Sequence, residues 1–195
     1  MASIAHLPKL VAEHGYLLAS STALAFYGIF AGGYFVGGAR GKAFGKEWLK
    51  DPKVQAIVDE HNNALADDKT KTLAPKFSAN GYPDMGMGRY SDTLSYKDWY
   101  SFNNAQRVHY NLVENLPSLI TLHLLAGAYF PRASAALAVP WLVARHIWGV
   151  NYISAGPEGR YNGIAVLHQL CMLSWFGMAV AGSLKASGVV STSWY

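Results

Sequence analysis

The feature that most constrains the fold is an apolar run from Tyr16 to Ala39 that contains no charged residue. A helix rises about 1.5 Å per residue, so about 20 residues cross the hydrocarbon core of a bilayer. The run is longer than the hydrophobic part of a typical secretory signal, and Glu13 as well as Lys9 precedes it. We therefore expect a membrane-spanning helix that is not cleaved.

Three more apolar stretches follow later in the chain, and we expect further spans at about 102–130, 133–155 and 163–186. Pro140 falls inside one of them, where neighbouring helices can satisfy the carbonyl that a proline leaves unpaired. The expected connections, Pro131-Arg132 and 156–160, are short, and short connections make neighbouring helices antiparallel. The chain is thus predicted to be a single all-α membrane domain over 1–195, an integral up-down four-helix bundle.

Charged residues are distributed unevenly, because most of them fall between Arg40 and Arg107. Lys and Arg in this segment alternate with Asp and Glu, a pattern that does not indicate a nucleic-acid-binding surface. Basic residues crowd the exit of the first span, and Arg160 follows on the same side. The opposite side carries Lys9, Arg132 and Lys185. This bias predicts that the long central loop faces the cytosol or the mitochondrial matrix, with both termini on the other side.

The central segment contains the signals of a short helix and a loop. Asp51-Pro52 is typical of an N-cap followed by proline at the first helical position, and apolar residues then recur at helical spacing. We predict an amphipathic helix at 52–66, outside the membrane. The stretch 74–98 is rich in Pro, Gly, Tyr and Ser, which predicts a loop.

A polar row lies in the second expected span. Arg107, Asn111 and Glu114 recur at i, i+4 and i+7, which places them on one face of a helix. An ionised group at mid-bilayer costs about 2.5–3.5 kcal/mol on insertion scales, so each needs a partner or a function. Arg145 in the third span could pair with Glu114 across helices. For Arg107 and Asn111 we favour binding of a small zwitterionic or anionic ligand.

Histidines raise a second possibility, haem ligation, because His109 and His123 share a face of the second span. No single helix supplies two matching histidines, since His146 and His168 lie on different spans, and we expect neither haem nor metal. Interhelical hydrogen bonding is the expected role of His123 and His168. Cys171, the one cysteine of the sequence, is expected to be a buried apolar filler.

The segment Phe102-Asn103-Asn104-Ala105-Gln106-Arg107-Val108-His109-Tyr110-Asn111-Leu112-Val113-Glu114 resembles a signature of the MAPEG superfamily, the membrane-associated proteins of eicosanoid and glutathione metabolism. Within it, the pattern is most similar to that of type-three microsomal glutathione transferases. The resemblance is extended by Ala39-Arg40, Tyr82-Pro83, the Tyr129–Arg132 segment, and Arg145 with Tyr152. It covers nearly the whole chain except about 47–80, which it implies to be an extramembrane insertion.

The resemblance implies a homotrimer that binds glutathione as co-substrate between subunits and takes a lipophilic second substrate from the bilayer. It implies a membrane-bound glutathione transferase or peroxidase in the endoplasmic reticulum or a mitochondrial membrane. Arg160 would be the catalytic cation that stabilises the glutathione thiolate. The implied glutathione-binding residues are Arg40, Arg107, His109, Asn111, Glu114, Arg145 and Tyr152.

The chain also departs from the family pattern. Trp148 stands where relatives have tyrosine, Asn115 replaces a tyrosine of the leukotriene-forming relative, and Gly159 and Asn162 flank Arg160 where basic residues are common. These departures bear on thiolate activation more than on glutathione binding. The alternative is therefore a non-catalytic relative, either a lipid-binding scaffold or an accessory subunit of a larger membrane complex such as a mitochondrial one.

Overall fold

The computed structural model describes residues 7–66 and 84–190, and this part of the chain is all-helical, without strands. The predicted all-α class is therefore confirmed. By length and composition, two described stretches, His14–Lys50 and Gly163–Ala186, are apolar enough to cross a membrane. They coincide with the first and fourth predicted spans. The four-span bundle as a whole stays a prediction.

The chain divides into two compact units. Unit 1 comprises Met1–Ala31 and Tyr110–Tyr195, and unit 2 comprises Gly32–His109. Their boundaries fall within helix α1 (Leu7–Gly32) and helix α4 (Tyr96–Tyr129). Each unit is described below by itself.

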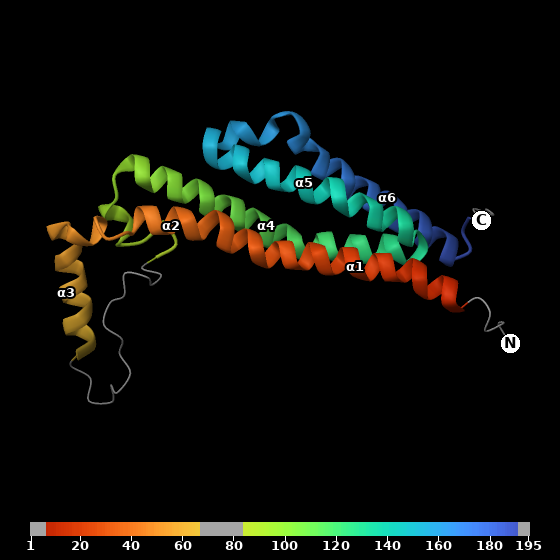
Figure 1. Cartoon of the computed structure of the whole chain (residues 1–195), viewed down its shortest axis with the longest axis horizontal. Coiled ribbons are helices and arrows are strands. Elements are labelled where there is room, and N and C mark those ends of the chain that lie inside the picture. The colour runs from red at the N-terminus through yellow and green to blue at the C-terminus, as the bar shows by residue number, and fades with distance from the viewer. Residues whose placement is uncertain (1–6, 67–83, 191–195) are drawn as a thin grey trace. The chain divides into compact units, whose positions relative to one another are not determined.

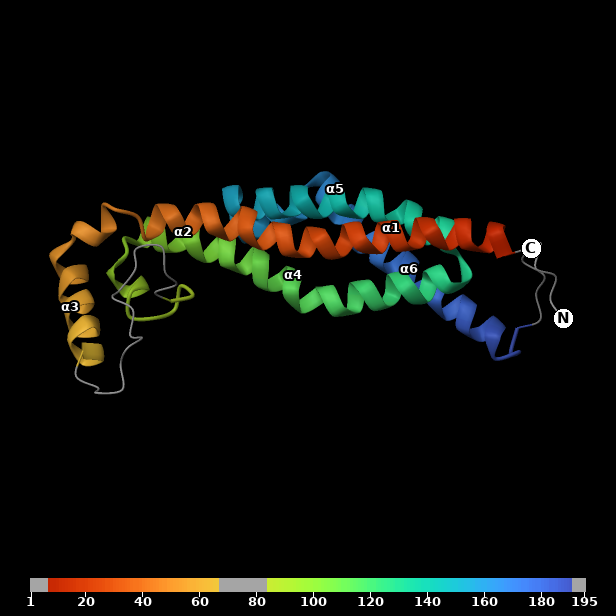
Figure 2. The same cartoon turned by 60° about the horizontal axis from the view of Figure 1, so that its bottom comes forward.

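Unit 1 contains the first part of α1, the second part of α4, and helices α5 (Pro131–Ala155) and α6 (Leu167–Ala186). Phe130 alone separates α4 from α5. The connection predicted at Pro131-Arg132 is therefore wrong, because these two residues are the first residues of α5. Proline suits this place because its missing N–H would have no helical partner there. Helices α5 and α6 contact each other, as Figures 1 and 2 show.

A buried histidine connects the helices of unit 1. The Ser20 hydroxyl on α1 is 3.0 Å from His123 Nε2 on α4, and the Ser134 hydroxyl on α5 is 2.9 Å from His123 Nδ1. Trp175 on α6 donates its indole N–H to the Ser134 carbonyl at 3.1 Å, and its ring meets the His123 imidazole edge-on. The predicted interhelical hydrogen bonding of His123 is confirmed.

The predicted role of His168 is different in the structure. Its Nδ1 bonds the carbonyl of Ala165, three residues earlier, rather than a group on another helix. The imidazole lies 6.0 Å from the Trp148 ring, centroid to centroid. His168 thus packs against α5 while its hydrogen bond stays in its own turn.

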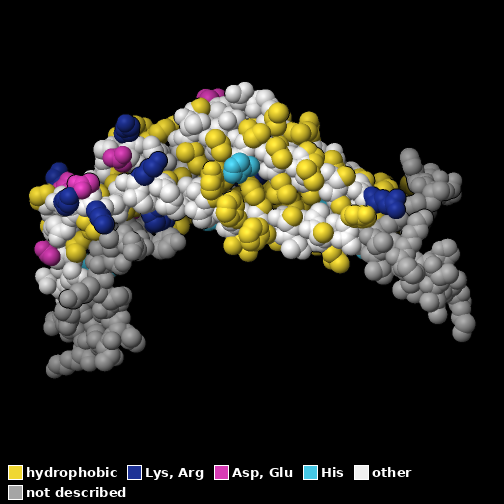
Figure 3. All heavy atoms as spheres, viewed as in Figure 1, with side chains coloured by type: hydrophobic (Ala, Val, Ile, Leu, Met, Phe, Trp, Pro, Cys, Tyr) yellow, Lys and Arg dark blue, Asp and Glu magenta, His cyan; other side chains and the backbone are white. Residues whose placement is uncertain are grey.

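The outer face of unit 1 is apolar (Figure 3). Leu18, Phe26 and Ile29 on α1 are 64%, 64% and 78% exposed, and Leu173 and Phe176 on α6 are also exposed. Water penalises such a surface, whereas lipid does not. The exposed apolar side chains favour a membrane around unit 1.

Unit 2 consists of short helical segments around the start of α4. Its segments are the π-helical turn η2 (Gly33–Gly37), α2 (Gly38–Ala43), η3 (Trp48–Lys50), α3 (Pro52–Ala66) and η4 (Ser91–Thr93). Its core contains the buried side chains Val36, Ala43, Phe44 and Phe102. The Phe44 and Phe102 rings meet edge-on at 5.1 Å, a favoured aromatic geometry.

The described part of the predicted loop, from residue 84 onward, is held by side chains from several segments. The Asp84 carboxylate accepts hydrogen bonds from the N–H groups of Gly86, Tyr90 and Ser91. Arg40 and Gln106 donate to the carbonyls of Asp84 and Met85, at 3.2 and 3.3 Å. The loop is therefore ordered here, whereas its first part and Tyr82-Pro83 lie outside the described residues.

Side chains of Asp51 and Ser95 cap the starts of α3 and α4. The helix predicted at 52–66 is confirmed as α3, and the Asp51 carboxylate accepts the Lys53 N–H at 2.8 Å. Helix α4 begins at Tyr96, earlier than the predicted loop end at Asp98 and the predicted span start at Phe102. Ser95 accounts for the difference, because its hydroxyl caps the Asp98 N–H and donates to the Asp98 carboxylate.

Removing one hydroxyl should test the buried histidine network. We expect Ser134→Ala to destabilise the protein by about 1–3 kcal/mol, because it leaves a fully buried imidazole nitrogen without its partner. The measurement is the thermal unfolding midpoint in detergent. Ser174→Ala is the control, since that exposed hydroxyl bonds its own helix; equal effects of the two variants would contradict the role of the network.

Acid should loosen α3 from the loop. Arg89 makes a two-pronged ion pair with Glu60 on α3, and this contact lowers the pKa of the Glu60 carboxyl. Because this pKa is lower in the folded protein than in the unfolded chain, the ion pair stabilises the folded state fully above the ordinary carboxyl pKa of about 4.3. The stabilisation is lost as the pH falls through the lowered pKa. Protection of the α3 amides from hydrogen exchange, relative to the intrinsic exchange rate at each pH, should therefore fall with acidification in wild type, and Glu60→Gln should remove this fall.

Candidate functional site

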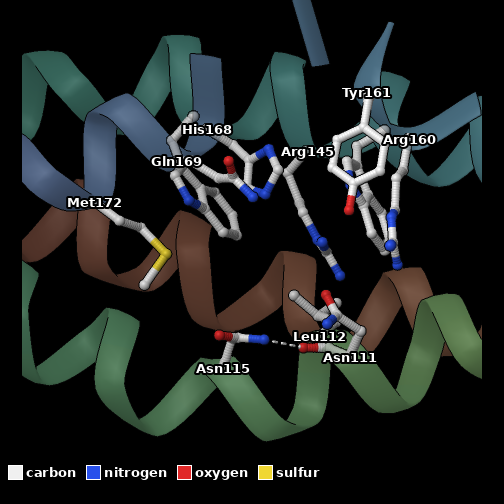
Figure 4. A pocket seen from close by; sticks show the side chains of 11 residues that line it. Asn111, Leu112, Asn115, Arg145, Arg160, Tyr161, His168, Gln169 and Met172 are labelled. Carbon is white, nitrogen blue, oxygen red and sulfur yellow. Dashed lines mark hydrogen bonds between the residues drawn. The ribbon is translucent and has the colours of Figure 1, made fainter. Parts of the chain in front are cut away.

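Unit 1 contains a cavity of about 250 Å³ between α4, α5, α6 and the segments that join α5 to α6. Its polar lining comes from Asn111, Asn115, Arg145, Arg160, Tyr161, His168 and Gln169. Its apolar lining comes from Leu112, Trp141, Trp148 and Met172. Figure 4 shows the labelled side chains converging on this space.

Arg145 brings one positive charge to the cavity from the middle of α5. Its side chain is 4% exposed, and its guanidinium carbon lies 4.0 Å from the centre of the Trp148 ring. A cation over an aromatic face gains about 0.5–2 kcal/mol, the more so where water is excluded. In Figure 4 the guanidinium points toward Asn111 and Leu112 on α4. The stacking on Trp148 orients the Arg145 guanidinium toward the cavity, where it could bind a ligand.

Arg160 supplies a second charge from the 3-10 turn η5 (Pro157–Tyr161). Its guanidinium lies 4.6 Å from the centre of the Tyr161 ring, and its buried Nε has no hydrogen-bond partner in the described structure. Gly156 at φ 73° reverses the chain after α5, a conformation that glycine adopts readily. The backbone thus places Arg160 beside the cavity with a donor still unused.

The electrostatics of the cavity favour an anion. Two guanidinium groups line it, and no carboxylate is among its lining residues. Cations in a partly closed, low-dielectric space attract anions more strongly than they would in water. Amide groups of Asn111, Asn115 and Gln169 add donors and acceptors. This combination suits a small ligand with negative charge and several polar groups.

The structure brings together part of the predicted site. Asn111, Arg145 and Arg160 all line the cavity. Tyr152 is buried next to it, with its ring 5.2 Å from that of Trp148. Glu114 is exposed on α4 and makes no ion pair within the described residues, so the possible Arg145–Glu114 pair is not formed.

The other three predicted residues belong to unit 2. Arg107 is exposed on α4, and His109 lies against Gly32, where an added Cβ would come within 2.8 Å of the imidazole. Arg40 is buried, with its guanidinium 5.1 Å from the centre of the Phe102 ring. Their participation in a ligand site with the cavity residues stays a prediction.

Several cavity residues were not predicted from the sequence to be part of a site. Asn115 was named only as a departure from the family pattern, and Gln169 was not named, although a neutral polar residue in a membrane helix was an available signal. Tyr161 and Met172 gave none, because exposed tyrosines and apolar methionines are ordinary at helix ends and in spans. Among the described residues, no group of three or more His, Cys, Asp or Glu side chains could hold a metal ion.

These features describe a helical protein with two stretches apolar enough to cross a membrane and with a cavity lined by two arginines. Its sequence matches the MAPEG family over residues 17–181, and the chain belongs to that family. Membership indicates a membrane glutathione transferase or a related function, with glutathione as the ligand that family members use. The finer resemblance to type-three enzymes stays a prediction.

A glycine substitution should test how the Arg160 turn is held. A Cβ on Gly159 would lie 2.3 Å from the Asn151 carbonyl oxygen, so Gly159→Ala should displace the turn and lower the thermal midpoint. Gly177→Ala is the matched control, because nothing lies within 4 Å of its added Cβ. Alanine in a helix interior should be neutral or stabilising there, by up to about 1 kcal/mol. Equal effects would contradict the crowding at Gly159.

Proposed function

We propose that this protein is a membrane-bound glutathione transferase or glutathione peroxidase that acts on lipophilic electrophiles or lipid hydroperoxides. The observation that carries the proposal is the presence, in a MAPEG chain, of a cavity lined by two arginines and no carboxylate. Glutathione is a small anion with several polar groups, which this lining suits. It would enter from the cytosolic or matrix side.

Arg160 is the proposed catalytic residue. The thiolate, not the thiol, is the nucleophile, and a cation beside the sulfur favours the thiolate. The buried Nε of Arg160 has no partner in the described structure, so it can donate to the sulfur without breaking a hydrogen bond. Arg145, Asn111 and Tyr152 would hold the tripeptide within unit 1.

The remaining proposed contacts are Glu114 of unit 1 and Arg40, Arg107 and His109 of unit 2. Glu114 and Arg107 are exposed on α4 in the single chain. That exposure suits a site shared between subunits of the proposed homotrimer, in which α1, α4, α5 and α6 would span the bilayer as an up-down bundle. The endoplasmic reticulum and a mitochondrial membrane are both proposed locations.

The decisive experiment measures glutathione binding and turnover by the purified protein, with Arg160→Ala and Arg107→Ala compared. We expect Arg160→Ala to lower kcat by about 10²-fold or more, because it removes charge stabilisation from the reacting sulfur, and to spare most of the binding. Arg107→Ala should weaken binding. Arg89→Ala is the control, since that exposed arginine pairs with Glu60. Equal inactivity of all proteins, without glutathione binding, would contradict the proposal.

A second candidate is a non-catalytic accessory subunit or lipid-binding scaffold. It is favoured by the burial of Arg40, whose guanidinium donates hydrogen bonds to the Asp84 carbonyl and the Met85 sulfur in the single chain. Native-gel migration in mild detergent separates the two. A band near three subunits supports the enzyme, whereas stable co-migration with a larger assembly supports the accessory role.

A further inference from the structure

Tyr161 is a cavity residue that neither the sequence pattern nor the proposed thiolate site uses. It follows Arg160 directly, and its ring packs against the Arg160 guanidinium at 4.6 Å. It lines the cavity, and 59% of the residue is exposed. In Figure 4 the side chain points into the cavity together with those of Arg145 and Arg160. Of the residues that line this cavity, Tyr161 alone carries a hydroxyl.

The two reactions open to a glutathione thiolate differ in their need for an acid. Displacement of chloride from a haloarene releases a stable anion that requires no proton. Attack on a hydroperoxide releases an alkoxide, a strong base that leaves far more readily if an acid protonates it. A proton donor beside the sulfur site therefore has a use in hydroperoxide reduction that it lacks in this displacement.

Among the cavity side chains, the alternatives to Tyr161 are poor donors. The guanidinium groups of Arg145 and Arg160 stay charged and can only hydrogen-bond. His168 is 7% exposed, and its Nδ1 is engaged by the Ala165 carbonyl. The phenol can give up a proton, and its solvent exposure provides a route for replacing it.

We propose that Tyr161 is the proton donor for hydroperoxide reduction at this site, an inference that rests on the proposed function. The thiolate sulfur bonds the terminal oxygen of the hydroperoxide, and the O–O bond breaks. The sulfur is oxidised to a sulfenic acid, while the departing alkoxide takes the Tyr161 proton and becomes an alcohol. Water reprotonates the phenolate, and a second glutathione converts the sulfenic acid to the disulfide, releasing water.

The apolar lining is consistent with the carbon skeleton of such a substrate. Leu112, Trp148 and Met172 line the same cavity as the guanidinium groups. A hydroperoxide on an apolar chain could thus place its oxygens near the charges and its carbons against these side chains.

The test uses Tyr161→Phe, which keeps the ring over Arg160 and removes only the hydroxyl. We expect kcat for glutathione-dependent reduction of cumene hydroperoxide to fall by about 10²-fold. Conjugation of 1-chloro-2,4-dinitrobenzene and the KM for glutathione should stay unchanged, because neither involves the proton. Tyr96→Phe, at an exposed tyrosine of unit 2, is the control and should leave both reactions unchanged.

Tyr161→Leu distinguishes acid catalysis from packing, because it also removes the ring and should depress both reactions. The inference is overturned if the Phe variant keeps full peroxidase activity, or if it loses both activities equally. A wild-type protein that binds no glutathione and turns over neither compound overturns the proposed function, and this inference with it. A wild type that conjugates the haloarene but reduces no hydroperoxide overturns the inference alone.

Discussion

The hydrogen bonding of one imidazole sets the arrangement of unit 1. His123 is fully buried, and both of its ring nitrogens meet hydroxyls, from Ser20 on α1 and Ser134 on α5. Within an apolar surrounding, an unpaired ring nitrogen would be costly, so the hydroxyls must keep their positions. Trp175 extends the same network to α6. The helices are thus joined at a defined register, which apolar contacts alone, being non-directional, would not impose.

The cavity depends on that register. Arg145 on α5 stacks on Trp148, and both face the same space as Asn111 on α4 and His168 on α6. Helix α5 carries Arg145, and helix α4 carries Arg107 and Glu114, so both are less apolar than a helix whose residues are all uncharged. The two stretches that stand out by hydropathy are those of α1 and α6, which lack such charges at their centres. The lower apolarity of α4 and α5 therefore accompanies the residues from which the site is built.

Local sequence signals were enough to predict the helices, whereas the cavity also depends on packing between distant segments. The Asp51 cap and apolar spacing placed α3, since a cap and its helix are neighbours in sequence. The Ser95 cap was an equally local signal that went unused, which set the start of α4 too late. Tyr161 and Trp141 were out of reach, because what makes them cavity residues is packing between segments distant in sequence. Asn111 and Arg145 were within reach because polarity in an apolar helix demands an explanation.

The burial of Cys171 has a consequence for the chemistry of sulfur in this protein. It is the one cysteine of the chain, and its side chain is 2% exposed within α6. In the proposed reaction, this thiol would therefore be out of reach of a sulfenic acid formed on glutathione. A second glutathione molecule would then supply the other sulfur of the disulfide. The protein would then be a template on which two small thiols react in turn, without becoming a redox partner itself.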